Sequence, residues 1–279
     1  MRFSLEKDAP LRPYIVTAAM NRPILAPRLP RDIVWYDPLD DAHQAYCTAL
    51  NRANSFAHDG SPVPGTHSTA LGMPRWVQLD CCLLPAAMIG YETPREYLPK
   101  DAADALDPTG TLAWIAVSEY VALPSVEQGR HTGISMFSLV RGGGLGVRSK
   151  ALGLRAVHSS ELIGVTQYSS PGVAVHLRFG PLHIVSPSVA VHSRPHETFV
   201  YRLDVPSPAI LDGLAHQSVS HVPIDLENEW AVEHIFDPRD PEALSHALNY
   251  IRERPTWVLG YQGMEEGKIV ELHLGRPRS

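Results

Sequence analysis

One stretch of the chain combines a cation with glycines at a spacing that suits anion binding. Residues 141–146 read Arg-Gly-Gly-Gly-Leu-Gly, and the β-prone run His131–Val140 leads into them. A helical pattern follows, with Val147, Ala151 and Leu154 on one face. N–H groups at a helix N-terminus lack partners, and glycines let a phosphate approach the backbone closely. The sequence therefore predicts a phosphate-binding loop, although the same glycines also suit a plain strand-to-helix connection.

Two familiar nucleotide-binding loops fit this stretch less well. A Walker loop requires Gly-Lys followed by Ser or Thr, and the chain has no such tripeptide here. The dinucleotide fingerprint requires an acidic residue about 20 positions later, at the end of a strand. Glu161 lies near that distance, but it begins its predicted strand.

Glu119 is the candidate general base. It lies in the predicted strand Thr111–Pro124, where the residues on its own face are apolar: Ile115, Val117, Val121 and Leu123. A carboxylate on such a face loses hydration, so its pKa should rise toward a value useful for proton transfer. The alternative is a structural carboxylate bonded to a neighbour.

The order of the predicted elements indicates an α+β protein. A short strand at 32–36 and a helix at 40–56 precede three strand-like segments at 76–89, 111–124 and 131–140; after the loop and helix at 141–158 come strands at 161–168, 182–186 and 198–205. Residues 1–29 are rich in proline and predict a surface arm, and 30–205 form the main domain. Residues 206–279, with a helix from Asp240 and a hairpin over 257–274, predict a C-terminal extension or small subdomain.

The loop resembles a known family. Arg141–Gly146 is similar to the R-x-x-G-x-G/A loop of the GNAT superfamily of acyl-CoA-dependent N-acyltransferases, and Ser170–Gly180 resembles that family's N-x-x-A-x-x-L-Y-x-K-x-G-F segment. The resemblance covers residues 30–205. It implies a mixed, mostly antiparallel sheet flanked by helices, and transfer of an acetyl or other acyl group from acyl-CoA to a small-molecule amine.

The resemblance also implies roles for individual residues. The CoA diphosphate would lie on Arg141, Gly142, Gly143, Gly144, Leu145 and Gly146, and the pantetheine arm would pair with the backbone of Phe137, Leu139 and Val140. Ser170 occupies the position of the family's Asn and is a further CoA contact. His176 occupies the position of the family's Tyr, so it would protonate the departing thiolate. Tyr168 is a second candidate for that proton.

The segment after Ser170 permits two structures. Val173, Val175, Leu177 and Phe179 alternate as in a strand, whereas Ser170-Pro171 is a good helix start and the family has a helix there. The sequence leaves this choice open.

Two other functions fit parts of the sequence. Gly146–Lys150 and Glu119 resemble the Schiff-base lysine segment and upstream Glu of the acetoacetate decarboxylase family, with Arg148 near Lys150 to lower its pKa. A non-catalytic acyl-CoA or metabolite binder would keep the loop without the chemistry.

Composition restricts the partners. The net charge is −6 and no basic run stands out, which disfavours nucleic acid. No apolar run approaches the roughly 20 residues of a membrane helix, residues 1–10 show no apolar leader, and three cysteines without a C-x-x-C pair indicate a reducing, cytoplasmic location. Pro195 between His192 and His196 disfavours a metal-binding helix, so no metal is expected. A small-molecule substrate is the expected partner, with a homodimer as one possible assembly.

Overall fold

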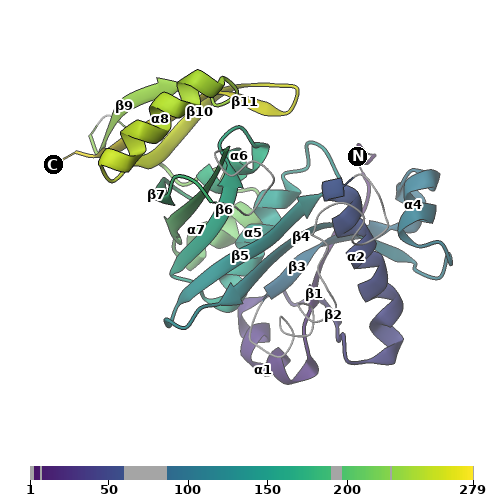
Figure 1. Ribbon diagram of the computed structural model, residues 1–279. Helices are drawn as coiled ribbons and strands as arrows, with labels where there is room; N and C mark the ends of the chain where they lie inside the picture. Colours follow the sequence, from purple (N-terminus) through teal and green to yellow (C-terminus); the bar gives the residue numbers. More distant parts are fainter. Residues whose placement is uncertain (1–2, 7, 60–86, 190–196, 227, 279) are drawn as a thin grey trace. The chain divides into compact units, whose positions relative to one another are not determined.

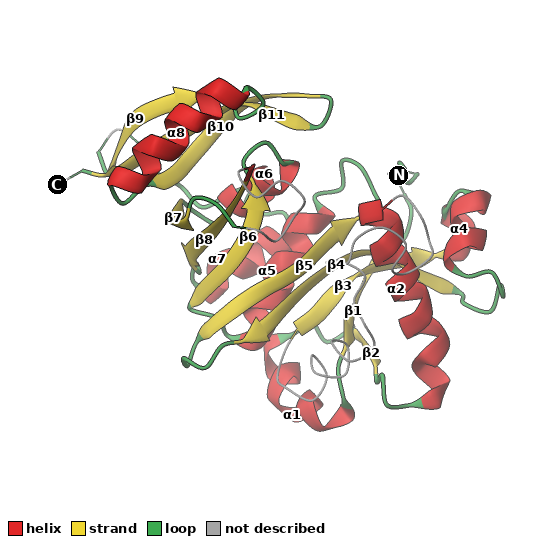
Figure 2. Ribbon diagram, in the orientation of Figure 1, coloured by secondary structure: helices red, strands yellow, loops and turns green. Residues whose placement is uncertain are grey.

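The computed structural model describes residues 3–6, 8–59, 87–189, 197–226 and 228–278 (Figure 1). The chain divides into two compact units, Met1–Ser159 and Ser160–Ser279. Each unit combines helices with mostly antiparallel strands, so the expected α+β class is confirmed (Figure 2). The predicted domain boundary after residue 205 stays a prediction.

The described residues of the first unit include five strands in the order β2-β1-β3-β4-β5. Only β1 and β2 pair in parallel; the other neighbours are antiparallel. Its elements are β1 (Arg12–Val16), η1 (Ala19–Asn21), α1 (Arg22–Leu25), η2 (Ala26–Arg28), β2 (Val34–Tyr36), η3 (Asp41–His43), α2 (Gln44–Asp59), β3 (Ala87–Pro94), η4 (Arg95–Tyr97), α4 (Lys100–Leu106), β4 (Trp114–Pro124), β5 (Arg130–Ser138) and α5 (Leu145–Val157).

Two helices cover the two faces of this sheet. The longer helix α2 packs on β4 and β5, whereas α5 packs on β3 and β4 (Figure 1). Neighbouring residues of β4 point to opposite faces, so Glu119 bonds to Asn54 of α2 while the Tyr120 ring lies against Gly153 of α5. The sheet thereby separates the face of Glu119 from the face of α5.

The expectation of a surface arm over residues 1–29 is wrong. Residues 12–16 form β1 in the interior of the strand order, and Tyr14 and Ile15 are fully buried. A partly buried ion pair adds to the pairing of this strand, because Arg12 Nε donates to the Glu92 carboxylate of β3. Pro13 lies within the strand and only five residues are extended, so the strand is too short to produce a periodic pattern.

In the second unit, the part of the chain that the structure describes forms six strands in the order β6-β8-β7-β10-β11-β9. All neighbouring pairs are antiparallel. Its elements are β6 (Glu161–Gln167), α6 (Pro171–Leu177), β7 (Leu182–Ser186), β8 (Thr198–Asp204), α7 (Pro208–Ala215), β9 (Trp230–Phe236), α8 (Pro241–Glu253), β10 (Trp257–Glu265) and β11 (Lys268–Pro277). Helix α8 lies over β9, β10 and β11 (Figure 2), and Asp240 caps it by accepting from the Glu242 N–H.

Most of the predicted elements are confirmed. The strands at 111–124, 131–140, 161–168, 182–186 and 198–205, the helix at 145–158, the C-terminal helix and the hairpin all occur, with ends that differ by a few residues. Most of the predicted strand at 76–89 lies outside the described residues, as do Cys81, Cys82, His192 and His196; β3 is described from Ala87. None of the helices within the described ranges has an apolar stretch long enough to span a bilayer.

Gly153 determines how closely α5 approaches β4. A Cβ atom there would lie 2.5 Å from a ring carbon of Tyr120 and 3.2 Å from a methyl of Ile89. We expect Gly153→Ala to lower the free energy of unfolding by about 1–2 kcal/mol, because the overpacking exceeds the gain in helix propensity. Denaturant titration measures the effect, and Tyr120→Leu in the same chain should relieve it. A Gly153→Ala protein as stable as the parent would contradict this packing.

Candidate functional site

The glycine loop joins a strand to a helix, as expected. Strand β5 ends at Ser138 and α5 begins at Leu145. Gly142 (φ 84°) and Gly144 (φ 61°, ψ 15°) both adopt the left-handed conformation that favours glycine. A Cβ at Gly142 would meet no atom within 4 Å, and the Arg141, Gly142 and Gly144 residues are exposed. The loop therefore presents open backbone beside a cation.

The backbone of residues 139–141 is already hydrogen-bonded. The Leu139 N–H donates to the Val117 carbonyl of β4 at 2.9 Å, and the Val140 N–H donates to Ser138 Oγ at 3.3 Å. The Arg141 N–H donates to the Phe3 carbonyl, and the Phe3 N–H donates to the Leu139 carbonyl, each at 2.9 Å. The first N–H groups of α5 have no intrahelical acceptor by geometry. The N–H groups available to an anion are thus those at the start of the helix.

The side chains of the strand serve the core. Phe137, Leu139 and Leu145 are buried, whereas Val140 and Gly146 are half-buried. The resemblance assigns CoA contacts to the backbone groups of these residues. Packing of their side chains in the core is compatible with that role.

Glu119 is fully buried beside α2. Asn54 Nδ2 donates to Glu119 Oε1 at 3.3 Å and to Ser135 Oγ at 2.9 Å. Glu119 Oε2 and Asn54 Oδ1 have no hydrogen-bond partner among the described residues. Burial raises the pKa of Glu119 to about 8, and the Asn54 hydrogen bond offsets part of that rise. The carboxyl group therefore changes its charge near neutral pH.

The ladder between β4 and β5 sets the position of Glu119 relative to the loop. Glu119 lies opposite Phe137, and Ser118 lies opposite Ser138 at the last residue of β5. Opposed residues of a ladder share a face, so Glu119, Ser135 and Phe137 face α2 together. The predicted base and the predicted loop strand are neighbours within the first unit.

The segment after Ser170 is a helix. Ser170 Oγ accepts from the Gly172 N–H at 3.0 Å, Pro171 is the first helical residue, and α6 runs to Leu177. Val173, His176 and Leu177 are buried at helical spacing. The strand-like alternation of apolar residues does not decide the structure here, because the Ser170 cap and the buried face of Val173, His176 and Leu177 both favour a helix.

His176 lies among polar groups of the second unit. Its ring centroid is 4.8 Å from that of Tyr201. A Cβ on Gly172 would lie 3.2 Å from both Ser170 Oγ and Thr166 Oγ1 and 3.9 Å from His176 Nε2, so these three side chains converge on Gly172. The structure thus brings Ser170 and His176 together. The second candidate donor, Tyr168, is fully buried and donates its hydroxyl proton to the Pro187 carbonyl at 3.0 Å.

Lys150, the residue of the rival interpretation, is fully buried in α5. Burial holds its pKa well below the ordinary lysine value. Its neighbour Ser149 bonds to Ser118 of β4 through their hydroxyls at 2.9 Å. Lys150 is therefore a buried residue of a helix that packs on the sheet.

Sequence reasoning missed several polar residues of these clusters. Asn54 and Ser135 contact each other beside Glu119, and Thr166 and Tyr201 lie beside His176. Asn54 follows Ala53, within the apolar stripe of α2. A polar residue on the buried side of a helix needs a hydrogen-bond partner, and this requirement could have indicated that Asn54 belongs to a polar cluster. Thr166 and Tyr201 lie in strands where such residues are common, and no pattern distinguishes them.

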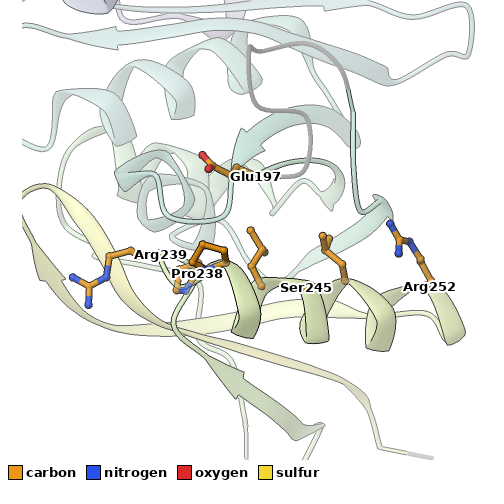
Figure 3. Close-up of a pocket in the computed structure, with 8 residues that line it drawn as sticks. Glu197, Pro238, Arg239, Ser245 and Arg252 are labelled. Carbon is orange, nitrogen blue, oxygen red and sulfur yellow. The ribbon is translucent and has the colours of Figure 1, made fainter.

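A cavity of about 400 Å³ lies elsewhere in the second unit. Glu197 lies across from Ser245 and Arg252 of α8, with Pro238 and Arg239 before the helix (Figure 3). The Arg239 guanidinium donates to the carboxylates of Asp237 and Glu265. None of the predicted site residues lines this cavity. Within the described ranges, no group of three or more His, Cys, Asp or Glu side chains could hold a metal ion.

Comparison with known proteins identifies no family for this chain. No family model matches the chain, and no curated protein matches it. Among solved structures, a protein of Acinetobacter baylyi described as a candidate acetyltransferase matches 61% of this chain and 90% of its own, with 14% identity and a TM-score of 0.39. A likeness this distant carries no argument about function.

The raised pKa of Glu119 makes folding stability depend on pH. In the folded chain the pKa of the carboxyl is about 8, against 4.5 for an ordinary Glu. The stability that the protonated Glu119 contributes to the folded state is therefore complete below pH 4.5 and is lost as pH rises to 8. We expect the free energy of unfolding to fall by up to about 1.4 kcal/mol per pH unit in that window. Glu119→Gln should remove this slope, as chemical denaturation from pH 5 to 8 would measure.

Glu127→Gln is the matched control, because it removes a carboxylate of the same unit that is largely exposed. It should leave the slope unchanged. If Glu119→Gln and Glu127→Gln give the same pH dependence, Glu119 does not titrate in this range.

Proposed function

We propose that the protein is a GNAT-type acyltransferase that moves an acetyl or other acyl group from CoA to an amine of a small molecule. One observation carries the proposal: β5 passes into α5 through two left-handed glycines, next to the exposed Arg141. A diphosphate needs close approach to backbone N–H groups, a favourable helix dipole and a cation. Residues 141–146 supply these three features together.

The chemistry requires two proton transfers. The amine nitrogen attacks the thioester carbonyl, a C–N bond forms, the C–S bond breaks, and the thiolate of CoA leaves. Glu119 would accept the proton that the amine loses, and its carboxylate form predominates above about pH 8. His176, by resemblance, would give a proton to the thiolate. Asn54 would act as a positioning residue, because it donates to the Glu119 carboxylate.

Binding of CoA tests the loop directly. We expect CoA and acetyl-CoA to raise the melting temperature of the full chain, because a ligand that binds only the folded state stabilises it. Arg141→Glu should weaken CoA binding by about tenfold or more, since it replaces the cation at the diphosphate by an anion. A thermal-shift titration measures both effects.

Arg31→Glu is the control for charge, because Arg31 is an exposed arginine of the same unit and undergoes the same change of two charges. CoA should stabilise this variant as it stabilises the parent. Equal losses in both variants would show a non-specific charge effect, and no CoA shift in the parent would refute the acyltransferase. A CoA shift without thiol release from acetyl-CoA, over a panel of amines, would indicate a non-catalytic binder.

The second candidate is a Schiff-base enzyme, and the lowered pKa of Lys150 is the observation that favours it. A neutral lysine amine adds to a ketone, water leaves, and borohydride reduces the C=N bond to a stable adduct. We expect no adduct with a β-keto acid, because a Schiff base requires the ketone carbon itself to reach the Lys150 amine, which has no exposed surface, whereas a buried base such as Glu119 can take a proton through one water. Mass spectrometry of the treated protein decides this, with Lys150→Met as the control. An adduct in the parent but not in Lys150→Met would establish the rival function.

A further inference from the structure

The N-terminal segment makes a small parallel bridge with the strand that enters the glycine loop. Phe3 pairs with Val140 through two hydrogen bonds: its N–H donates to the Leu139 carbonyl and its carbonyl accepts from the Arg141 N–H, each at 2.9 Å. The Phe3 residue itself is half-buried. One peptide segment of the chain therefore occupies the backbone edge at residues 139–141.

This edge is the one that the proposed function assigns to CoA. The Leu139 N–H is already bonded to Val117 of β4, so the Leu139 carbonyl and the Arg141 N–H are the groups that face the Phe3 backbone. The pantetheine arm carries amides that bond to such groups as a peptide does, and a diphosphate oxygen needs donors such as the Arg141 N–H. Phe3 thus offers the same donor and acceptor as the ligand.

Outside the bridge, the described residues of this segment have no regular structure until β1. Residues 4–6 and 9–11 belong to no strand or helix, and Ser4, Glu6, Asp8 and Pro10 are exposed. The next anchors are the Pro10 carbonyl, which accepts from Thr93 Oγ1 at 2.9 Å, and β1, which begins at Arg12 and is paired on both sides. Two hydrogen bonds of the bridge therefore hold the segment at the edge, and a tether of a few residues keeps it near when it leaves.

We infer that residues 3–6 are a built-in competitor for acyl-CoA, which must leave the Leu139–Arg141 edge before the pantetheine arm and the diphosphate can bind. This inference rests on the proposed function. The apparent affinity for CoA is then the intrinsic affinity multiplied by the fraction of molecules in which the edge is open. Anything that holds the segment away from the edge activates the enzyme, and anything that fixes it there inhibits it.

Phe3→Pro tests the competition in the full chain, because proline has no N–H to donate to Leu139. Phe3→Ala is its matched control: it removes the same side chain but keeps both backbone hydrogen bonds. We expect Phe3→Pro to bind CoA about tenfold more tightly than Phe3→Ala in a calorimetric titration, which corresponds to the loss of about one net hydrogen bond from the closed state. Hydrogen exchange of the Arg141 amide should be slow in Phe3→Ala and fast in Phe3→Pro.

A second measurement uses the unaltered protein and so does not depend on how a variant folds. Saturating CoA should speed hydrogen exchange of the Phe3 amide, because the ligand displaces it from Leu139. Equal CoA affinity in both variants, or a Phe3 amide that stays protected when CoA is bound, would overturn the competition and leave the proposed function intact. If none of the proteins binds CoA, the proposed function itself fails.

Discussion

The chain reversal between β5 and α5 is the constraint on which the rest of the first unit depends. Six residues must turn a strand at the sheet into a helix that packs back on β3 and β4, and Gly142 and Gly144 make this turn in the left-handed region. Gly153 then lets α5 lie close to Tyr120. The first amides of α5, which follow this reversal, have no intrahelical acceptor. The geometry that closes the core is therefore the geometry that could hold a diphosphate.

The sheet separates two buried groups of unusual acidity. Glu119 faces α2 and is held by Asn54, whereas Lys150 belongs to α5 on the other face. Burial shifts the pKa of each group toward neutrality, because both lose the water that stabilises their charged forms. Glu119 is nevertheless the better candidate for chemistry, since the β4–β5 ladder sets it opposite Phe137 near the glycine loop.

Local pattern predicted the place of the glycine loop and the burial of Glu119 better than it predicted the short strand β1. The Arg141–Gly146 loop between strand and helix follows from glycines that no regular element tolerates well, and the apolar alternation around Glu119 predicted a buried carboxylate. The short strand β1 was missed, because five residues that include Pro13 give no period, and its partner strand β3 is distant in sequence: Arg12 pairs with Glu92, 80 residues later. Asn54 as the partner of Glu119 depends on the packing of α2 against β4 and could not be read from spacing.

By itself, the sequence determined the α+β class, most of the strands and helices, and the residues of the glycine loop, because these depend on local propensity and on periodic burial. Tertiary structure decided the helix at 171–177, where the Ser170 cap and the buried face of Val173 and Leu177 outweigh β-branched residues that alternate. It also decided that the Phe3 backbone occupies the carbonyl and amide at residues 139 and 141. Such hydrogen bonds between distant segments use backbone N–H and C=O groups, which nearly all residues carry. They therefore cannot be predicted from the types of the side chains.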